Sequence, residues 1–195
     1  TSSVYGDNNN FPLNENENTD KPLSFYAATK KSNEILAYSY SNIHQLPCTA
    51  LRFFTVYGPY GRPDMALFKF TKNILENKKI ELFNKGNHSR DFTYIADIVS
   101  GIISIIKKPK KSKIPFNIFN IGRGNSQKLK LYLHFIEKKL NKKANIKNLP
   151  LQVGDIKKTH SDISSLKNFS NYKPSIDIEE GIGEFIDWYI NYYKK

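Results

Sequence analysis

The segment from Thr49 to Gly58 most strongly limits the folds open to this chain. It is apolar and rich in β-branched and aromatic residues, and Pro47 and Pro59 bound it on either side. A short apolar run of this kind is typical of a strand that is covered on both faces, as in a parallel sheet. We therefore expect a buried parallel strand, and within it Arg52 as a structural ion-pair partner rather than a ligand.

A helix is predicted directly before this strand. Residues 26–44 contain neither Gly nor Pro, and Ser24 is a good helix N-cap. On such a helix Tyr26 and Lys30 are four residues apart and share a face. A free tyrosine has a pKa of about 10, and a nearby ammonium lowers such a value by favouring the phenolate. The pair can therefore act as a general base, although the spacing also fits an ordinary exposed helix turn.

The chain opens with the run Thr1 to Gly6, which carries three aliphatic hydroxyl side chains and ends in a small-residue turn. We interpret it as a short strand that leads through a polar loop to the helix. Thr1, together with Ser2, would hydrogen-bond the substrate oxygen that the phenol of Tyr26 deprotonates. The resulting order of strand, helix and strand is that of the tail of a doubly wound α/β sheet.

Several motifs resemble those of the extended short-chain dehydrogenase/reductase family, the NAD-dependent sugar-nucleotide epimerases and dehydratases. They are Thr1–Gly6, the Tyr-x-x-x-Lys signature at Tyr26–Lys30, Arg52–Pro59, Arg90–Asp97, Phe119–Gly122, and Gly181 with Trp188. The resemblance implies that Thr1, Tyr26 and Lys30 are catalytic. It also implies that NAD is the cofactor and that Tyr26 and Lys30 contact its nicotinamide ribose.

Within this family, the run Gly58–Ala66 resembles the UDP-glucuronate 4-epimerase branch, which implies a UDP-sugar substrate. The site residues implied are Ser2, Ser3 and Thr55 near the sugar, Arg62 at the uracil, Arg90 at the diphosphate, and Gly154 with Asp155 at the ribose. Thr55 and Asp155 could equally be ordinary strand and turn residues.

Arginines stand out because the chain has only four. A guanidinium makes forked, charge-assisted hydrogen bonds to phosphate oxygens, which suits the two arginines implied at the nucleotide. Each also has a structural alternative. Arg62 could be a solvated loop residue, and Arg90 could pair with Asp91 or Asp97.

The sequence lacks one feature that the family uses to bind dinucleotides. None of its ten glycines falls into the Gly-x-x-Gly-x-x-Gly turn that brings a pyrophosphate to a helix N-terminus. We therefore interpret the chain as the C-terminal part of a longer protein, or as a split or decayed gene product. We expect it to bind NAD poorly in isolation and assign the activity to the complete protein.

The predicted reaction is nucleotide-sugar 4-epimerisation through transient NAD-dependent oxidation at C4. A 4,6-dehydratase of the same family would need an acidic pair where Ser2 and Ser3 stand. A reductase or a decarboxylase stays open, as does a non-catalytic remnant that binds only a nucleotide sugar or a partner chain. The resemblance also implies a homodimer through the 26–44 helix of the complete protein.

The predicted fold class is α/β, namely the C-terminal part of a doubly wound, Rossmann-type parallel sheet with a smaller α/β substrate-binding lobe. We assign residues 1–60 to the sheet with its catalytic residues and 61–195 to the lobe, with about 88–122 returning to the large sheet. The other predicted elements are a helix capped by Asp64, a strand Ile80–Phe83 with a turn Asn84–Gly86, a helix Ile95–Ile106, a strand Phe116–Ile121, and helices near 127–141 and 178–193.

Charge and cysteine content limit the partners. The net charge is +12, but the lysines cluster in expected loops and helix surfaces without the alternating aromatics of a nucleic-acid platform. We therefore expect a solvated lysine face and neither a nucleic-acid nor a membrane partner. The single cysteine, Cys48, cannot form an internal disulfide, and no metal site is predicted. Without a segment suited to span a bilayer, we expect a soluble, cytoplasmic protein.

Overall fold

The computed structural model describes residues 1–151 and 155–194. Its helices are α1 (Phe25–His44), α2 (Ala66–Leu75), α3 (Ile95–Ile106), α4 (Leu129–Leu140), α5 (Ser164–Ser170) and α6 (Ile178–Tyr193), with 3-10 helices η1 (Ser2–Tyr5) and η2 (Asn84–Gly86). Its strands are β1 (Cys48–Phe53), β2 (Thr55–Tyr57), β3 (Lys79–Phe83), β4 (Ser89–Tyr94), β5 (Phe116–Ile121), β6 (Ser126–Lys128) and β7 (Asn145–Leu149).

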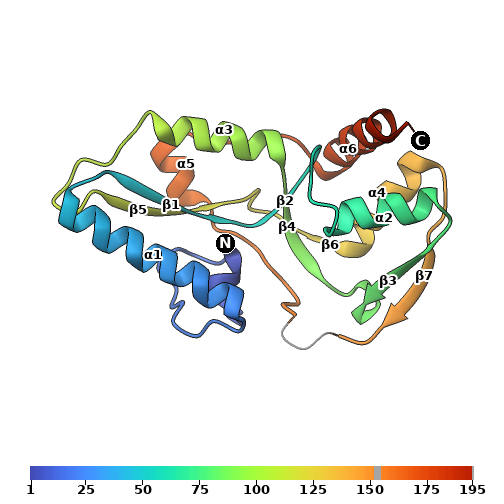
Figure 1. The fold of residues 1–195 in the computed structure, drawn as a ribbon, viewed down its shortest axis with the longest axis horizontal. Coiled ribbons are helices and arrows are strands. Elements are labelled where there is room, and N and C mark those ends of the chain that lie inside the picture. The colour runs from blue at the N-terminus through green and yellow to red at the C-terminus, as the bar shows by residue number, and fades with distance from the viewer. Residues whose placement is uncertain (152–154, 195) are drawn as a thin grey trace.

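A layered α/β unit is built on β1 and β5. The two strands run parallel, with Cys48 opposite Phe116 and Phe53 opposite Ile121. α1 covers one face of the pair, while α3 and α5 lie on the other (Figure 1). Ile98 of α3 packs in one apolar cluster with strand residues of β5 and with α5. The predicted α/β class and the parallel pairing are therefore confirmed.

The strand expected over Thr49–Gly58 is interrupted at Phe54. β1 pairs with β5, whereas β2 pairs in parallel with β4, with Thr55 opposite Phe92. The prediction of a strand buried on both faces was too strong, because every residue of β1 except Arg52 is only partly buried. Within the described residues β1 pairs with β5 alone, so that its other edge has no neighbouring strand.

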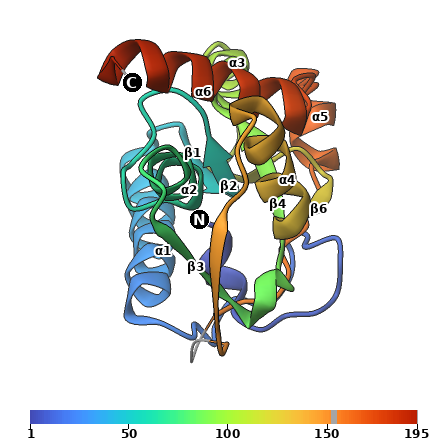
Figure 2. The ribbon, with the colours of Figure 1, turned by 90° about the vertical axis from the view of Figure 1, so that its right-hand side faces the viewer.

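A second group of elements surrounds a different core. α2, α4 and α6 share one apolar core with β3 and β4, and β3 runs parallel to β7 (Figure 2). Aromatic side chains fill this core, including Phe92 stacked on Tyr132 with ring centroids 4.2 Å apart. Stacked rings attract each other in addition to burying apolar area, and both effects stabilise this core. β4 links the two units, since it pairs with both β2 and β6.

The interpretation of Thr1–Gly6 as a strand was wrong. Residues Ser2–Tyr5 form the 3-10 turn η1, and the hydroxyl of Thr1 caps it by accepting from the backbone N–H of Ser3. Serine and threonine hydroxyls compete with strand pairing through such local bonds. The turn is anchored by Tyr5, whose buried phenol donates to Asn120 at 2.6 Å.

Asp64 does not cap the following helix, contrary to expectation. Its carboxylate is bonded to Arg62, and α2 begins after Met65, which provides no side-chain cap. The turn at Asn84–Gly86, the helix Ile95–Ile106 and the strand Phe116–Ile121 form as predicted.

Candidate active site

The site residues predicted from the sequence line one cleft of about 1010 Å³. It is bordered by η1, by the N-terminal turns of α1, by β1 and β2, and by the segment after residue 154. The predicted residues that line it are Thr1, Ser2, Ser3, Tyr26, Lys30, Thr55, Arg62, Arg90 and Asp155. Gly154 lies outside the described residues.

The phenol and the ammonium lie at the start of α1. Ser24 caps this helix as predicted, since its hydroxyl accepts from the backbone N–H of Ala27 at 3.1 Å. Tyr26, the second residue of the helix, is 54 % exposed and borders the cleft. The Lys30 Nζ atom lies 5.5 Å from the centroid of the Tyr26 ring, within the range of a cation–π contact. The helix thus holds a cation beside the aromatic ring of the phenol.

Three hydroxyl groups face the same cleft from η1. The Thr1 hydroxyl donates to the hydroxyl of Ser3 at 3.3 Å, while Ser2 lines the cleft beside them. η1 packs directly against α1. The cleft therefore brings together the hydroxyl, phenol and ammonium groups that a proton relay to a sugar hydroxyl requires.

A buried ion pair holds α1 to the sheet. Arg52 of β1 is 2 % exposed, and its Nε and Nη2 atoms donate to the two carboxylate oxygens of Glu34 at 2.9 and 2.8 Å. Its Nη1 atom donates to the Tyr5 phenol oxygen and to the Glu15 carbonyl, both at 3.1 Å. The expectation that Arg52 is a structural ion-pair partner is confirmed. Because Glu34 is one helix turn beyond Lys30, the pair also fixes the face of α1 that carries Lys30.

Arg90 has a different partner from those considered. Its Nη2 atom donates to the Asp155 carboxylate at 3.0 Å, so neither Asp91 nor Asp97 pairs with it. A third member of the group, His88, was not predicted from the sequence. Its Nε2 lies 2.9 Å from the other Asp155 oxygen without hydrogen-bond alignment. Burial lowers the pKa of His88 below its ordinary 6.5, despite the opposing effect of Asp155.

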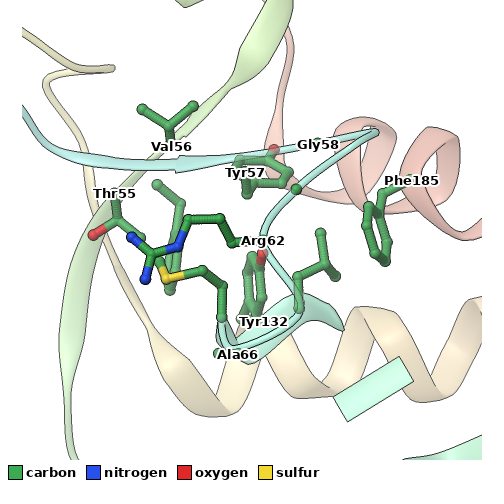
Figure 3. A pocket seen from close by; sticks show the side chains of 12 residues that line it. Thr55, Val56, Tyr57, Gly58, Arg62, Ala66, Tyr132 and Phe185 are labelled. Atoms are coloured by element: carbon green, nitrogen blue, oxygen red, sulfur yellow. The ribbon is translucent and has the colours of Figure 1, made fainter. Parts of the chain in front are cut away.

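Arg62 lies at the opposite, open part of the cleft. It is exposed and forms a two-pronged ion pair with Asp64, at 3.0 and 2.5 Å. Arg62 and Thr55 also line a small adjoining pocket of about 50 Å³, in which Tyr132 and Phe185 form part of the wall. Figure 3 shows the Arg62 side chain over this pocket, with its guanidinium on the side of Thr55.

The turn that carries Arg62 depends on Gly58. Its φ of 143° is unfavourable for other residues, and a Cβ atom there would lie 2.5 Å from Cγ2 of Ile95. The next residues bring Tyr60, 79 % exposed, to the edge of the cleft. Residue spacing alone did not indicate Tyr60, Met65 or Thr159, which also border the cleft.

The remaining chemistry of the described residues is limited. No group of three or more His, Cys, Asp or Glu side chains among them is arranged to hold a metal ion. None of the helices described combines the length and the apolar character that a bilayer crossing requires.

Comparison with known proteins places the chain in a family. The model of the NAD dependent epimerase/dehydratase family matches residues 1–122. The chain belongs to this family. It is 46% identical to Protein CapI of Staphylococcus aureus, over all of the chain and 63% of that protein. It is 44% identical to UDP-glucuronate 4-epimerase 1 of Arabidopsis thaliana, over 99% of the chain and 48% of that protein.

A solved structure has the same fold. UDP-glucuronic acid 4-epimerase from Bacillus cereus, in complex with UDP-glucuronic acid and NAD, superimposes with a TM-score of 0.91 at 34% identity. The match covers 99% of the chain and 60% of that structure. The chain thus spans about half to two thirds of the length of these relatives.

Proposed function

We propose that the protein carrying this chain is an NAD-dependent nucleotide-sugar 4-epimerase whose substrate is UDP-glucuronate. The observation that carries the proposal is the convergence on one cleft of the nine predicted site residues that the structure describes. Its support from relatives is the similarity to UDP-glucuronate 4-epimerases from a plant and a bacterium.

Tyr26 acts in this proposal as the general base. Its phenolate accepts the proton of the sugar C4 hydroxyl and returns it after the sugar has rotated in the cleft. Lys30 contributes a positive charge beside the ring. Thr1 holds the same sugar oxygen by a hydrogen bond and so orients it toward the phenol.

The nucleotide is held at the other residues of the cleft. Arg90 binds the diphosphate, Arg62 lies at the uracil, and Asp155 accepts from a ribose hydroxyl. Ser2, Ser3 and Thr55 surround the sugar. A guanidinium already oriented by a carboxylate, as Arg90 is by Asp155, loses less conformational freedom when a phosphate binds.

NAD fits the same edge of the cleft at its nicotinamide end. Tyr26 and Lys30 offer a phenol and an ammonium side by side, which suits the hydroxyls of the nicotinamide ribose. When bound, NAD supplies the reversible hydride acceptor that epimerisation at C4 requires. Because the chain has no glycine-rich phosphate turn, we expect residues 1–195 by themselves to bind NAD weakly.

The test is to incubate the protein with UDP-glucuronate and NAD and to identify the products by NMR. We expect UDP-galacturonate. Replacing Tyr26 by Phe should slow turnover by roughly 10²- to 10⁴-fold, because the general base is lost. Replacing Tyr192 by Phe, at an exposed tyrosine of α6 outside the cleft, should leave turnover unchanged. Formation of a 4-keto-6-deoxy sugar, or of no product, would show that the assignment is wrong.

A protein that binds nucleotide sugars without turnover is the second candidate. It is favoured by the absence of a glycine-rich phosphate turn from residues 1–195. Calorimetry with UDP and the NMR product assay together separate the two functions, because this candidate binds UDP but forms no product with NAD present. The cytoplasmic location expected from the sequence stays a prediction.

We also propose that α1 forms a homodimer interface. Ile35, Leu36 and Ile43 of this helix are 58 %, 66 % and 68 % exposed, and such a row of apolar side chains favours association. Light scattering of the protein should give a dimer, and Leu36→Lys should give a monomer. A wild-type monomer at micromolar concentration would exclude this interface.

A further inference from the structure

One wall of the cleft is a segment without regular secondary structure. Residues 155–161 include Asp155, Ile156 and Thr159, all of which line the cleft. Two backbone hydrogen bonds tie the segment to the start of β4: the Ser89 N–H donates to Lys157 at 2.9 Å, and the Thr159 N–H donates to Ser89 at 3.0 Å. A wall of this kind needs further anchors to keep Asp155 at a fixed place.

Asp91 of β4 supplies the strongest anchor. Its carboxylate is fully buried, at 0 % exposure. One oxygen, Oδ2, accepts from the backbone N–H and the hydroxyl of Ser161, at 2.9 and 2.5 Å, and from the Gly124 N–H at 3.1 Å. The other, Oδ1, accepts from the Arg123 N–H at 2.8 Å and weakly from Thr93 at 3.4 Å. The backbone N–H of Asp91 donates in turn to the Thr159 hydroxyl at 3.2 Å.

The side chain at position 91 must accept hydrogen bonds at both of its terminal atoms, and a hydrogen on either atom would oppose the donors around it. Three backbone N–H groups converge on the carboxylate, and an ionised carboxylate accepts at both oxygens, whereas an amide has one oxygen and a donating NH₂ group. No ion pair with Asp91 occurs in the part of the chain that the structure describes. The charge is therefore held by backbone and hydroxyl donors alone, which makes these bonds strong and directional.

We propose that Asp91 is a positioning residue for the nucleotide-sugar site, which fixes segment 155–161 to β4 and thereby holds Asp155 against Arg90. The inference rests on the proposed function, because the cleft must bind a nucleotide for the wall to matter. Arg90 and Asp91 are neighbours on β4 and point to opposite sides of the strand. In this proposal Arg90 faces the ligand, while Asp91 keeps Asp155, the partner of Arg90, in place.

Asp97 offers a matched control. It is a second buried carboxylate, 6 % exposed, that accepts from the backbone N–H groups of Ser175 and Ile176 at 3.0 and 3.1 Å. Neither it nor its partners line the cleft. Asp91→Asn and Asp97→Asn thus remove the same kind of group, and both should lower the melting temperature.

The experiment measures the affinity for UDP by calorimetry, and the KM and kcat for UDP-glucuronate, well below the melting temperature of each variant. Asp91→Asn should weaken UDP binding and raise KM by roughly tenfold or more, as expected when a positioning contact is lost. Asp97→Asn should leave both within about twofold of wild type. Equal effects of the two variants, or unchanged affinity in Asp91→Asn, would overturn the inference.

A milder variant keeps the test decisive if Asp91→Asn fails to fold. Ser161→Ala removes one hydroxyl donor of the same carboxylate and lies outside the cleft lining. It should weaken UDP binding by about two- to fivefold, corresponding to part of one hydrogen bond. Unchanged affinity in Ser161→Ala would then refute the proposal. Wild-type protein that binds no UDP would instead refute the proposed function, and with it the site that Asp91 serves.

Discussion

Removing Glu34 should destabilise the protein more than removing the whole ion pair. In Glu34→Leu, Arg52 keeps its charge at 2 % exposure and loses both carboxylate bonds. Breaking one side of a buried pair costs about 3–5 kcal/mol, because the remaining charge is desolvated without a partner. For a chain of this size, about 2–4 °C of melting temperature corresponds to each kcal/mol, so we expect a decrease of about 6–20 °C.

The double variant Glu34→Leu/Arg52→Met provides the comparison. Replacing a buried pair by apolar side chains of similar volume is often close to neutral. Arg52 also donates to Tyr5 and to the Glu15 carbonyl, and each of these lost bonds costs about 1 kcal/mol. We therefore expect a net loss of about 2 kcal/mol, smaller than that of the single variant.

Thermal and urea unfolding followed by circular dichroism measure both differences. The reasoning is refuted if Glu34→Leu loses less than about 1 kcal/mol, or if the double variant is no more stable than the single one. Either result would mean that water or local rearrangement reaches the guanidinium and compensates its charge.

Two further predictions concern α6 and His88. Gly181→Ala should lower the free energy of unfolding by about 1–3 kcal/mol, because the new Cβ atom would lie 2.5 Å from the Tyr57 hydroxyl. Gly183→Ala, with nothing within 4 Å of its Cβ atom, should raise it by up to about 1 kcal/mol through helix propensity. The same melting experiment measures both, and changes of equal sign would contradict the packing argument. Because the folded-state pKa of His88 is lowered from its ordinary 6.5, the unfolded chain takes up a proton that the folded one resists, and stability should fall as the pH drops below that value. His88→Asn should melt with less pH dependence between about pH 7.5 and about pH 5.5, and identical profiles would show that the imidazole is not responsible.

Local sequence signals predicted those helices and strands whose ends are marked by their own residues. The helix α1 has a serine cap and no Gly or Pro, and β5 is a short apolar run, so both form where expected. The strand β7, Asn145–Leu149, was missed because it is mostly polar and exposed and becomes a strand only by pairing with β3. The seven-residue helix α5 is too short to show a clear periodicity.

The candidate site was predicted by resemblance far more than by pattern. Spacing on one helix could relate Tyr26 to Lys30, but nothing local relates Arg90 to Asp155, 65 residues further along the chain. Arg52 was different, because a charge inside an apolar strand must find a partner. Thr1 lines the cleft although the strand expected there is a 3-10 turn, since a hydroxyl can line the cleft from a turn as well.

If Arg90 binds the diphosphate as proposed, its pairing with Asp155 should determine which anions the cleft selects. A guanidinium whose charge is already balanced by a carboxylate exerts little net attraction on a free inorganic ion, so sulfate or phosphate gains little there. A ligand gains more when it offers an oxyanion to the cation and, a few bonds away, a hydroxyl that donates to the carboxylate. Discrimination between whole nucleotides and simple salts then arises from this compensation, and binding should depend only weakly on ionic strength.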